Sequence, residues 1–197
     1  MNKFETLDSL LQEKNGFIKT SDAVNAGVSK TYFCDYVQSR GLERAAHGLY
    51  MSKEAWGDGM YVIQVRYPMV VFSHETALYL HGLAEREPVK YTVTMKAGAS
   101  TTRLAKQGVK VYKVKEELFE EGISEAKSPA GHLLRVYNPE RTICDLVRSR
   151  SNIDIQDLSA AIKEYTRRKD KNLPLLMRYA KVFSVQKTIR QYTEVLL

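Results

Sequence analysis

Four histidines are the side chains in this chain best suited to acid–base or metal chemistry. They are His47, His74, His81 and His132, and none stands in an HExxH motif or a comparable metal-binding spacing. His74 and His81 lie seven residues apart on one expected helix, but the sequence places no third ligand beside them. We therefore predict capping or packing roles for these histidines and no metal site.

Glu140, Arg141 and Asp145 form a charged cluster on a helix that Asn138 and Pro139 are suited to open. Glu140 falls in the first turn, where a carboxylate complements the helix dipole, and Arg141 and Asp145 have the i, i+4 spacing of an ion pair. The chain has no Walker-type loop, GxGxxG or GxSxG element. The sequence thus predicts no catalytic residues, no metal and no cofactor.

Residues 20–51 show a different kind of pattern. Their apolar spacing and turn residues predict a helix, a tight turn, a second helix and a short β-hairpin. Thr20 or Ser21 is expected to cap the first helix, Gly27 to end it at positive φ, and Ser29 to cap the second. This order is typical of a winged helix-turn-helix, a DNA-reading module.

The second helix of this module has two faces of opposite character. Its apolar face consists of Tyr32, Phe33, Tyr36 and Val37, and its polar face of Lys30, Thr31, Cys34, Asp35, Gln38 and Ser39. The wing is expected as Leu42–Arg44 and Gly48–Met51 around an Ala45-Ala46-His47 turn. An amphipathic helix carrying Phe4, Leu7, Leu10 and Leu11 precedes it, and residues 16–18 are expected to add a small strand.

The candidate DNA contacts lie on the second helix, the wing and the chain before the first helix. Backbone amides at a helix N-terminus favour phosphate, which points to the start of the second helix. The predicted contact residues are Lys19, Thr20, Ser29, Lys30, Thr31, Gln38, Arg44 and His47.

The positive charge of the chain is unevenly distributed. The net charge is +7, yet residues 1–53 hold 7 Lys and Arg against 6 Asp and Glu, whereas residues 159–197 hold 9 against 3. A nearly neutral module binds DNA phosphates weakly alone. The excess of Lys and Arg in residues 159–197 suggests a second basic surface that binds nucleic acid or an acidic partner. The alternative is that these side chains are only solvated faces of helices. Its residues are Lys163, Arg167, Arg168, Lys169, Lys171, Arg178, Lys181, Lys187 and Arg190.

The remaining chain predicts a mixed α+β domain that ends in a group of helices. We assign residues 1–53 to the DNA-binding domain and 59–197 to the α+β domain, with a short connection between them. No apolar run is long enough to span a membrane, no signal peptide is evident, and Cys34 and Cys144 suit free thiols, so the expected location is the cytoplasm.

Taken together, the two halves resemble AbiEi-type antitoxins of the bacterial AbiE abortive-infection systems, over nearly the whole chain. In the first half the matching residues are Ala23, Gly27, Val28, Ser29, Gly41, Leu42, Gly48, Leu49 and Tyr50. In the second half they are Ser73, Ala77, Leu78, His81, Gly82, Leu83, residues 137–143, Asp145 and Leu146. The second set, SxxxALxxHGL followed by NPERTIxDL, is the more specific.

This resemblance implies an antitoxin that also represses its own toxin–antitoxin operon by binding inverted repeats in double-stranded promoter DNA. The implied partner is a nucleotidyltransferase-like toxin, countered by the C-terminal domain in a type IV system without a necessary stable complex. Unlike more arginine-rich relatives, the recognition helix here has few basic residues. Two alternatives stay open: a DNA-targeted nuclease-like enzyme, and a ligand-responsive regulator with a pocket in residues 70–137.

Overall fold

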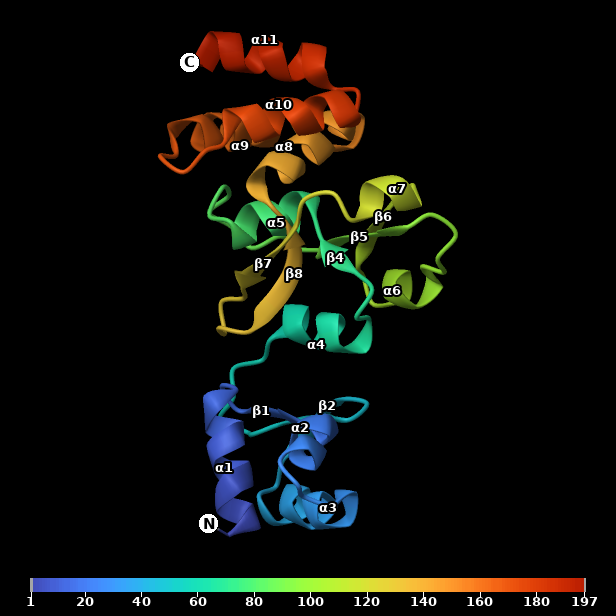
Figure 1. Ribbon diagram of the computed structural model, residues 1–197, viewed down its shortest axis with the longest axis vertical. Coiled ribbons are helices and arrows are strands. Elements are labelled where there is room, and N and C mark those ends of the chain that lie inside the picture. Colours follow the sequence, from blue (N-terminus) through green and yellow to red (C-terminus); the bar gives the residue numbers. More distant parts are fainter. Residues whose placement is uncertain (1, 197) are drawn as a thin grey trace. The chain divides into compact units, whose positions relative to one another are not determined.

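The computed structural model describes residues 2–196, which form two compact units with an α+β fold (Figure 1). The first unit comprises the chain up to Pro68 together with Lys127–Leu133. The second comprises Met69–Ala126 and the chain from Leu134 onward. The division therefore follows Pro68 instead of falling in the expected connection between residues 53 and 59, and a short distant segment joins the first unit.

The first unit is a helix, a strand, two helices, a hairpin and a further helix. Its elements are α1 (Lys3–Glu13), β1 (Phe17–Lys19), α2 (Thr20–Asn25), α3 (Lys30–Ser39), β2 (Glu43–Ala46), β3 (Leu49–Met51) and α4 (Gly59–Arg66). The strands form an antiparallel sheet in the order β1-β3-β2. The short strand expected near residues 16–18 is thus present and pairs with the hairpin.

The connection between α2 and α3 has the expected geometry. Gly27 adopts φ +78°, and the N–H of Val28 donates to the carbonyl of Ala23 at 2.9 Å while its side chain is buried. Ser29 caps α3 by accepting a hydrogen bond from the N–H of Tyr32 at 3.3 Å. The turn is fixed by local chemistry that the sequence displays.

Two local expectations are wrong. The N-cap of α2 is Lys19 instead of Thr20 or Ser21, and the Asp22 carboxylate accepts from the Lys19 N–H at 3.0 Å. The hairpin turn is His47-Gly48, because Ala45 and Ala46 remain in β2 beyond a bulge. Ala46 is buried, so hydrophobic packing extends the strand past the expected turn.

Two small cores hold the first unit together. One joins α1, β1, α2 and α3 through buried Leu7, Ile18, Ala23, Val28, Phe33 and Tyr36. The other lies around Phe17, Ala46 and Leu49, where Tyr61, Val62 and Val65 of α4 pack. Helix α4 is therefore part of the first unit's packing.

The segment Lys127–Leu133 is held in the first unit by a buried polar cluster. The Asp58 carboxylate accepts from Ser128 Oγ and pairs with His132 Nδ1 at 2.7 Å. The His132 ring stacks on Tyr61, with centroids 4.1 Å apart, and meets Phe17 edge-on. Burial alone raises the pKa of Asp58, but the hydrogen bonds from His132 and Ser128 hold it below its usual value.

The second unit contains a five-stranded sheet and most of the helices. Its elements are β4 (Val71–Phe72), α5 (His74–Leu80), β5 (Thr92–Lys96), α6 (Thr102–Lys106), β6 (Lys110–Val114), α7 (Glu116–Phe119), β7 (Ile123–Lys127), β8 (Leu133–Tyr137), α8 (Pro139–Arg148), a 3-10 turn (Arg150–Asn152), α9 (Ile155–Arg167), α10 (Leu173–Val182) and α11 (Gln186–Leu196). The strand order is β6-β5-β4-β8-β7. Strand β7 is only partly buried.

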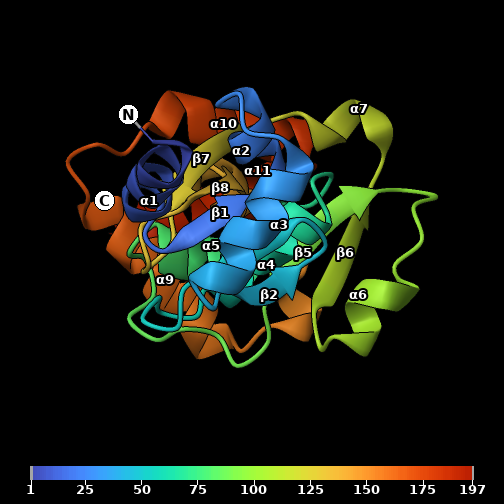
Figure 2. The same cartoon turned by 90° about the horizontal axis from the view of Figure 1, so that it is seen from below.

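The sheet and the late helices form separate layers of the second unit. Helices α6 and α7 flank the β5–β6 end of the sheet in both views (Figures 1 and 2). Helices α8 to α11 gather into a group whose core includes Ile143, Leu146, Ile162, Leu176 and Ile189 (Figure 1). In this half of the chain the strands come first and the group of helices last, as the sequence predicts.

Gly27 offers a direct test of the turn before α3. A methyl group at this position meets no atom within 4 Å, so replacing Gly27 with Ala introduces backbone strain without a steric clash. We expect Gly27→Ala to lower the free energy of unfolding by about 1 kcal/mol, the usual cost of a left-handed residue other than glycine. Denaturant unfolding of the full chain measures it.

Gly57 is the matched control for this substitution. It also has open space around the added methyl group, but its φ lies outside the left-handed region. Gly57→Ala should leave stability unchanged or raise it slightly. An equal loss in both variants would show that the turn is not held at positive φ.

Candidate nucleic-acid interface

Helix α3 exposes the polar face expected from its sequence. Phe33 and Tyr36 are buried against the unit core. The exposed side chains are Lys30, Thr31, Cys34, Asp35, Gln38 and Ser39. This face makes no contribution to the core, so its side chains are free to meet a ligand.

The candidate contacts on α3 lie at opposite ends of the helix. Lys30 and Thr31 occupy the first turn, where unpaired backbone N–H groups favour an anion. Gln38 is eight residues later, about 12 Å along the axis at about 1.5 Å per residue. A base or phosphate at the start of the helix is therefore out of reach of Gln38.

Two predicted contact residues have their hydroxyl groups engaged within the unit. Ser29 Oγ accepts from the N–H of Tyr32, as the cap of α3. The Thr20 hydroxyl donates to the carbonyl of Gly48 at 3.4 Å, and the Thr20 N–H donates to the same carbonyl at 2.8 Å. Thr20 thus fastens the hairpin turn to α2, a positioning role that the sequence did not indicate.

The β2–β3 hairpin, which is the expected wing, and the end of α4 carry three basic residues, Arg44, His47 and Arg66, which we call the wing cluster. The Arg44 guanidinium donates to His47 Nδ1 at 2.9 Å and to the carbonyl of Ala46 at 3.3 Å. Arg66, at the end of α4, donates to the carbonyl of Ala45 at 3.4 Å. All three side chains are exposed. Sequence reasoning missed Arg66, since only folding brings α4 beside the wing.

Three other cations of the first unit are engaged by neighbouring side chains. Arg40, at the end of α3, forms a bidentate pair with Asp8 of α1, and Lys14 pairs with Asp22 at 2.7 Å. Lys19 is half-buried, with its ammonium 5.4 Å from the centroid of the Tyr61 ring. The exposed cations of this unit without an ion pair in the described residues are then Lys30, Arg44 and Arg66, together with Lys3, Lys53 and Lys127.

The predicted basic surface divides into engaged and free cations. Arg167 pairs with Glu164 and Arg178 with Glu121, while Arg168 pairs with Asp170 and donates to the carbonyl of His81. Lys171 donates to the carbonyl of Arg168. The members of this predicted surface that are exposed and form no ion pair within residues 2–196 are Lys163, Lys169, Lys181, Lys187 and Arg190. We call these five residues the free C-terminal cations.

Arg141 lies at the centre of the second unit with no exposed surface. Its Nε donates to Asp145 at 2.9 Å, and its Nη1 donates to the carbonyls of Leu118 and Glu121, both at 2.8 Å. Two aromatic rings flank the guanidinium, with centroids 4.2 Å from Cζ for Tyr137 and 3.8 Å for Phe183. The predicted i, i+4 pair of Arg141 and Asp145 is confirmed as a buried structural pair.

Glu140 has a structural position as well. It is buried, and its Oε1 accepts from the Tyr165 hydroxyl at 3.0 Å and from the N–H of Asn172 at 3.1 Å. His81 Nε2 contacts the carbonyl of Tyr137 at 2.7 Å. These contacts join α5, α8, α9 and the start of α10, so the two motifs of the second half mainly hold elements together.

Ser73 and His74 form a second buried polar network beside the sheet. The Ser73 hydroxyl contacts His74 Nδ1 at 3.0 Å and accepts from Thr94 Oγ1 at 2.9 Å, and His74 Nε2 contacts Ser149 Oγ at 3.1 Å. The His74 ring stacks on Tyr112 with centroids 3.5 Å apart, and its backbone is left-handed at φ +49°. The strained backbone is held by these contacts.

Across residues 2–196, no group of three or more His, Cys, Asp or Glu side chains is arranged to hold a metal ion. Within the same range, no helix is both long enough and apolar enough to cross a membrane.

Comparison with known proteins gives information on the fold alone. No protein-family model matches the sequence, and no curated protein is similar to it. The fold is similar to that of the Rv2827c protein from Mycobacterium tuberculosis, with a TM-score of 0.56 and 12% sequence identity. That similarity covers 100% of this chain and 81% of the other. At 12% sequence identity, this structural similarity shows that the two chains share a fold and nothing more.

The buried His74 makes the stability of the second unit depend on pH. Burial, aided by the nearby charges of Lys110, Arg141 and Arg148, lowers the pKa of His74 to about 3. In the unfolded chain the pKa is about 6.5, so between these values the unfolded chain binds the extra proton. Stability is then complete above about pH 6.5 and falls as the pH decreases towards 3.

We expect His74 to account for a loss of about 2 kcal/mol in unfolding free energy between pH 7 and pH 5. Urea unfolding of the second unit at both pH values measures it, and His74→Gln should remove this part of the pH dependence. His47→Gln, at an exposed position, is the control. If His74→Gln kept the full pH dependence, His74 would not be neutral in the folded protein.

Proposed function

We propose that the first unit is a winged helix-turn-helix that binds double-stranded DNA, with α3 in the major groove and the β2–β3 hairpin as the wing. The observations that carry the proposal are the exposed polar face of α3 and, in the same unit, the exposed wing cluster of Arg44, His47 and Arg66. The order of helices and the sheet order β1-β3-β2 support it.

In this proposed interface, α3 and the wing cluster have different roles, which follow from the positions of their charged side chains. Lys30 and Thr31 in the first turn of α3 are positioned for base edges or an adjacent phosphate. The wing cluster supplies phosphate contacts that carry no sequence information but set the position of α3. With few free cations, one copy binds weakly, which favours an operator with two half-sites related by an inverted repeat.

We further propose that the chain is the antitoxin of a bacterial toxin–antitoxin operon and represses that operon. The resemblance to AbiEi-type antitoxins supports this role, and the partner is then a nucleotidyltransferase-like toxin. We assign the antitoxin activity to the second unit, and the free C-terminal cations to the surface that meets an acidic partner or nucleic acid. Their exposure and lack of ion pairs leave these cations available for such a contact.

The DNA proposal is tested with the full chain and a duplex covering the region upstream of its own gene. Affinity is measured over a range of salt concentrations for the wild type, Arg44→Ala and Arg66→Ala. Each variant should weaken binding and reduce the slope of log K against log[salt] by about 1, the value for one lost phosphate contact.

Lys53→Ala is the matched control, because Lys53 is an exposed cation of the same unit outside α3 and the wing. It should leave both affinity and slope unchanged. If the slope of log K against log[salt] were the same for Arg66→Ala and the wild type, α4 would not be part of the interface. Undetectable binding of the wild type to the upstream duplex at low salt would contradict the DNA proposal itself.

The antitoxin proposal is tested by replacing all five free C-terminal cations with Gln. Cells that express the toxin should then lose rescue, while operator affinity stays within about twofold of the wild type, since long-range charges are screened at physiological salt. The matched control replaces five exposed cations elsewhere in the second unit, namely Lys90, Arg103, Lys106, Lys113 and Lys115.

The outcomes of this experiment are distinct. Lost rescue with unchanged operator binding supports a toxin-related surface, and a reduced salt slope shows instead that the C-terminal helices contact operator DNA. Rescue and slope both equal to those of the control variant would show that the free C-terminal cations are only a solvated surface.

A further inference from the structure

The exposed face of α3 is centred on one stripe of side chains. At about 100° of rotation per residue, Thr31 and Gln38 lie about 20° apart around the helix axis. Both are exposed, on the side away from the buried Phe33 and Tyr36. Asp35 is exposed too and lies between them along the helix, about 40° from Thr31 around the axis. The centre of this face therefore carries a carboxylate and no cation.

Two cations lie on opposite flanks of this stripe. Lys30 and Tyr32 are two residues apart, about 200° around the axis, so they occupy opposite sides of α3. The ammonium group of Lys3, the first residue of α1, lies 5.3 Å from the centroid of the Tyr32 ring. Lys3 and Lys30 are both exposed, and neither has an ion pair within residues 2–196. Each flank of the stripe thus has one available positive charge.

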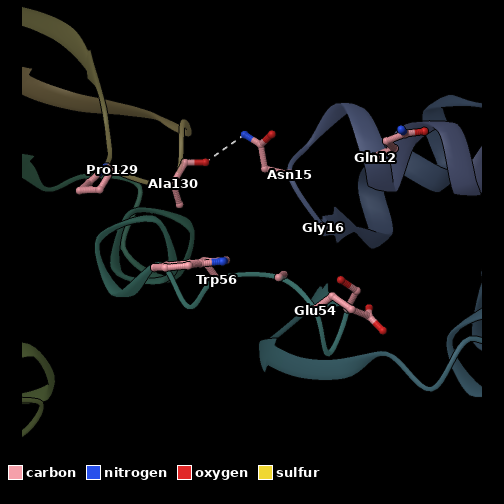
Figure 3. Close-up of a pocket in the computed structure, with 9 residues that line it drawn as sticks. Gln12, Asn15, Gly16, Glu54, Trp56, Pro129 and Ala130 are labelled. Carbon is pink, nitrogen blue, oxygen red and sulfur yellow. Dashed lines mark hydrogen bonds between the residues drawn. The ribbon is translucent and has the colours of Figure 1, made fainter.

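Helix α1 is held at both ends, which keeps Lys3 beside α3. At the beginning of α1, Phe4 packs against Tyr32, with ring centroids 5.2 Å apart. Just after the end of α1, the side-chain amide of Asn15 donates to the carbonyl of Ala130 at 3.0 Å, the contact drawn as a dashed line in Figure 3. The backbone of α1 is therefore fixed within the first unit, and with it the flank on which Lys3 lies.

The major groove of DNA matches this distribution of charge. Phosphates of the two strands border the groove, which is about 12 Å wide, so a helix lying in it has phosphates on both sides. With α3 in the groove, as in the proposed complex, Lys3 and Lys30 meet opposite strands and Asp35 faces the base edges. A carboxylate there is repelled by the phosphates and can only accept a hydrogen bond. The donors that the groove offers are the amino groups of cytosine N4 and adenine N6.

The atoms beside these amino groups distinguish the two bases. Adenine N6 lies beside N7, an acceptor that repels a carboxylate, whereas cytosine N4 lies beside the hydrogen on C5. We propose that Asp35 accepts a hydrogen bond from N4 of a cytosine and so selects a C·G pair in each half-site. This assignment rests on the proposed DNA-binding function. At any other base pair the carboxylate lacks this partner, so Asp35 acts largely by rejecting wrong sequences.

The test uses the full chain and the duplex that covers the region upstream of its gene. Each C·G pair of the protein footprint is replaced in turn by T·A, in both half-sites together, which exchanges the N4 donor for the O4 acceptor of thymine. One such replacement should weaken wild-type binding about tenfold. Asp35→Asn should lose less than about threefold at the same pair, because its amide can donate to thymine O4.

Glu13→Gln is the matched control, because Glu13 is an exposed carboxylate at the end of α1 without an ion pair in the described residues. It should show the same loss as the wild type at every pair. Lys3→Ala tests the flank of the stripe. It should reduce the slope of log K against log[salt] by about 1 and keep the C·G preference, as expected for a phosphate contact.

Failure of this assignment is distinct from failure of the DNA proposal. If the wild type bound the upstream duplex and no C·G replacement weakened it, or if Asp35→Asn lost as much as the wild type at every pair, the assignment alone would be wrong. A wild-type salt slope for Lys3→Ala would contradict the flanking arrangement from which the assignment follows. Undetectable binding of the wild type would overturn both.

Discussion

The second unit depends on one buried cation, the guanidinium of Arg141. Removing such a charge from water is costly unless it is paired and hydrogen-bonded, and here Asp145, two backbone carbonyls and two aromatic rings surround it. The same contacts fix the chain after α7 against α8. Gly122 completes this packing at φ +79°, because a Cβ there would lie 2.7 Å from that of Arg141. The position of α8 against the sheet follows from these contacts.

This arrangement changes how the motifs of the second half are interpreted. Side chains that look suited to catalysis in the sequence, such as Glu140, Asp145 and His74, are buried and bonded to neighbouring elements. Their chemistry serves to satisfy polar groups inside a core, where an unpaired group is expensive. The free C-terminal cations lie on and between the late helices of this unit and are exposed.

The first unit combines a nearly neutral composition with a local concentration of charge. Its ion pairs use Asp8, Asp22 and Asp58 to hold helices and the Lys127–Leu133 segment. Lys30 and the wing cluster stay exposed, as do Lys3, Lys53 and Lys127. Phosphate binding depends on where cations lie more than on the net charge of a domain, since screening confines their influence to about 10 Å. In the proposed DNA complex, a small number of exposed cations in the same unit as α3 would set the position of that helix.

The sequence alone determined the features that arise within a few residues. The Ser29 and Asn138 caps, the Gly27 turn and the two faces of α3 depend on local backbone geometry and helical period, so they were predictable. Only the tertiary structure decided that α4 places Arg66 at the wing and that Lys127–Leu133 belongs to the first unit. It also decided that the Thr20 hydroxyl fastens the hairpin. These contacts join residues far apart in the chain, and no local spacing encodes them, because they depend on how complete elements pack.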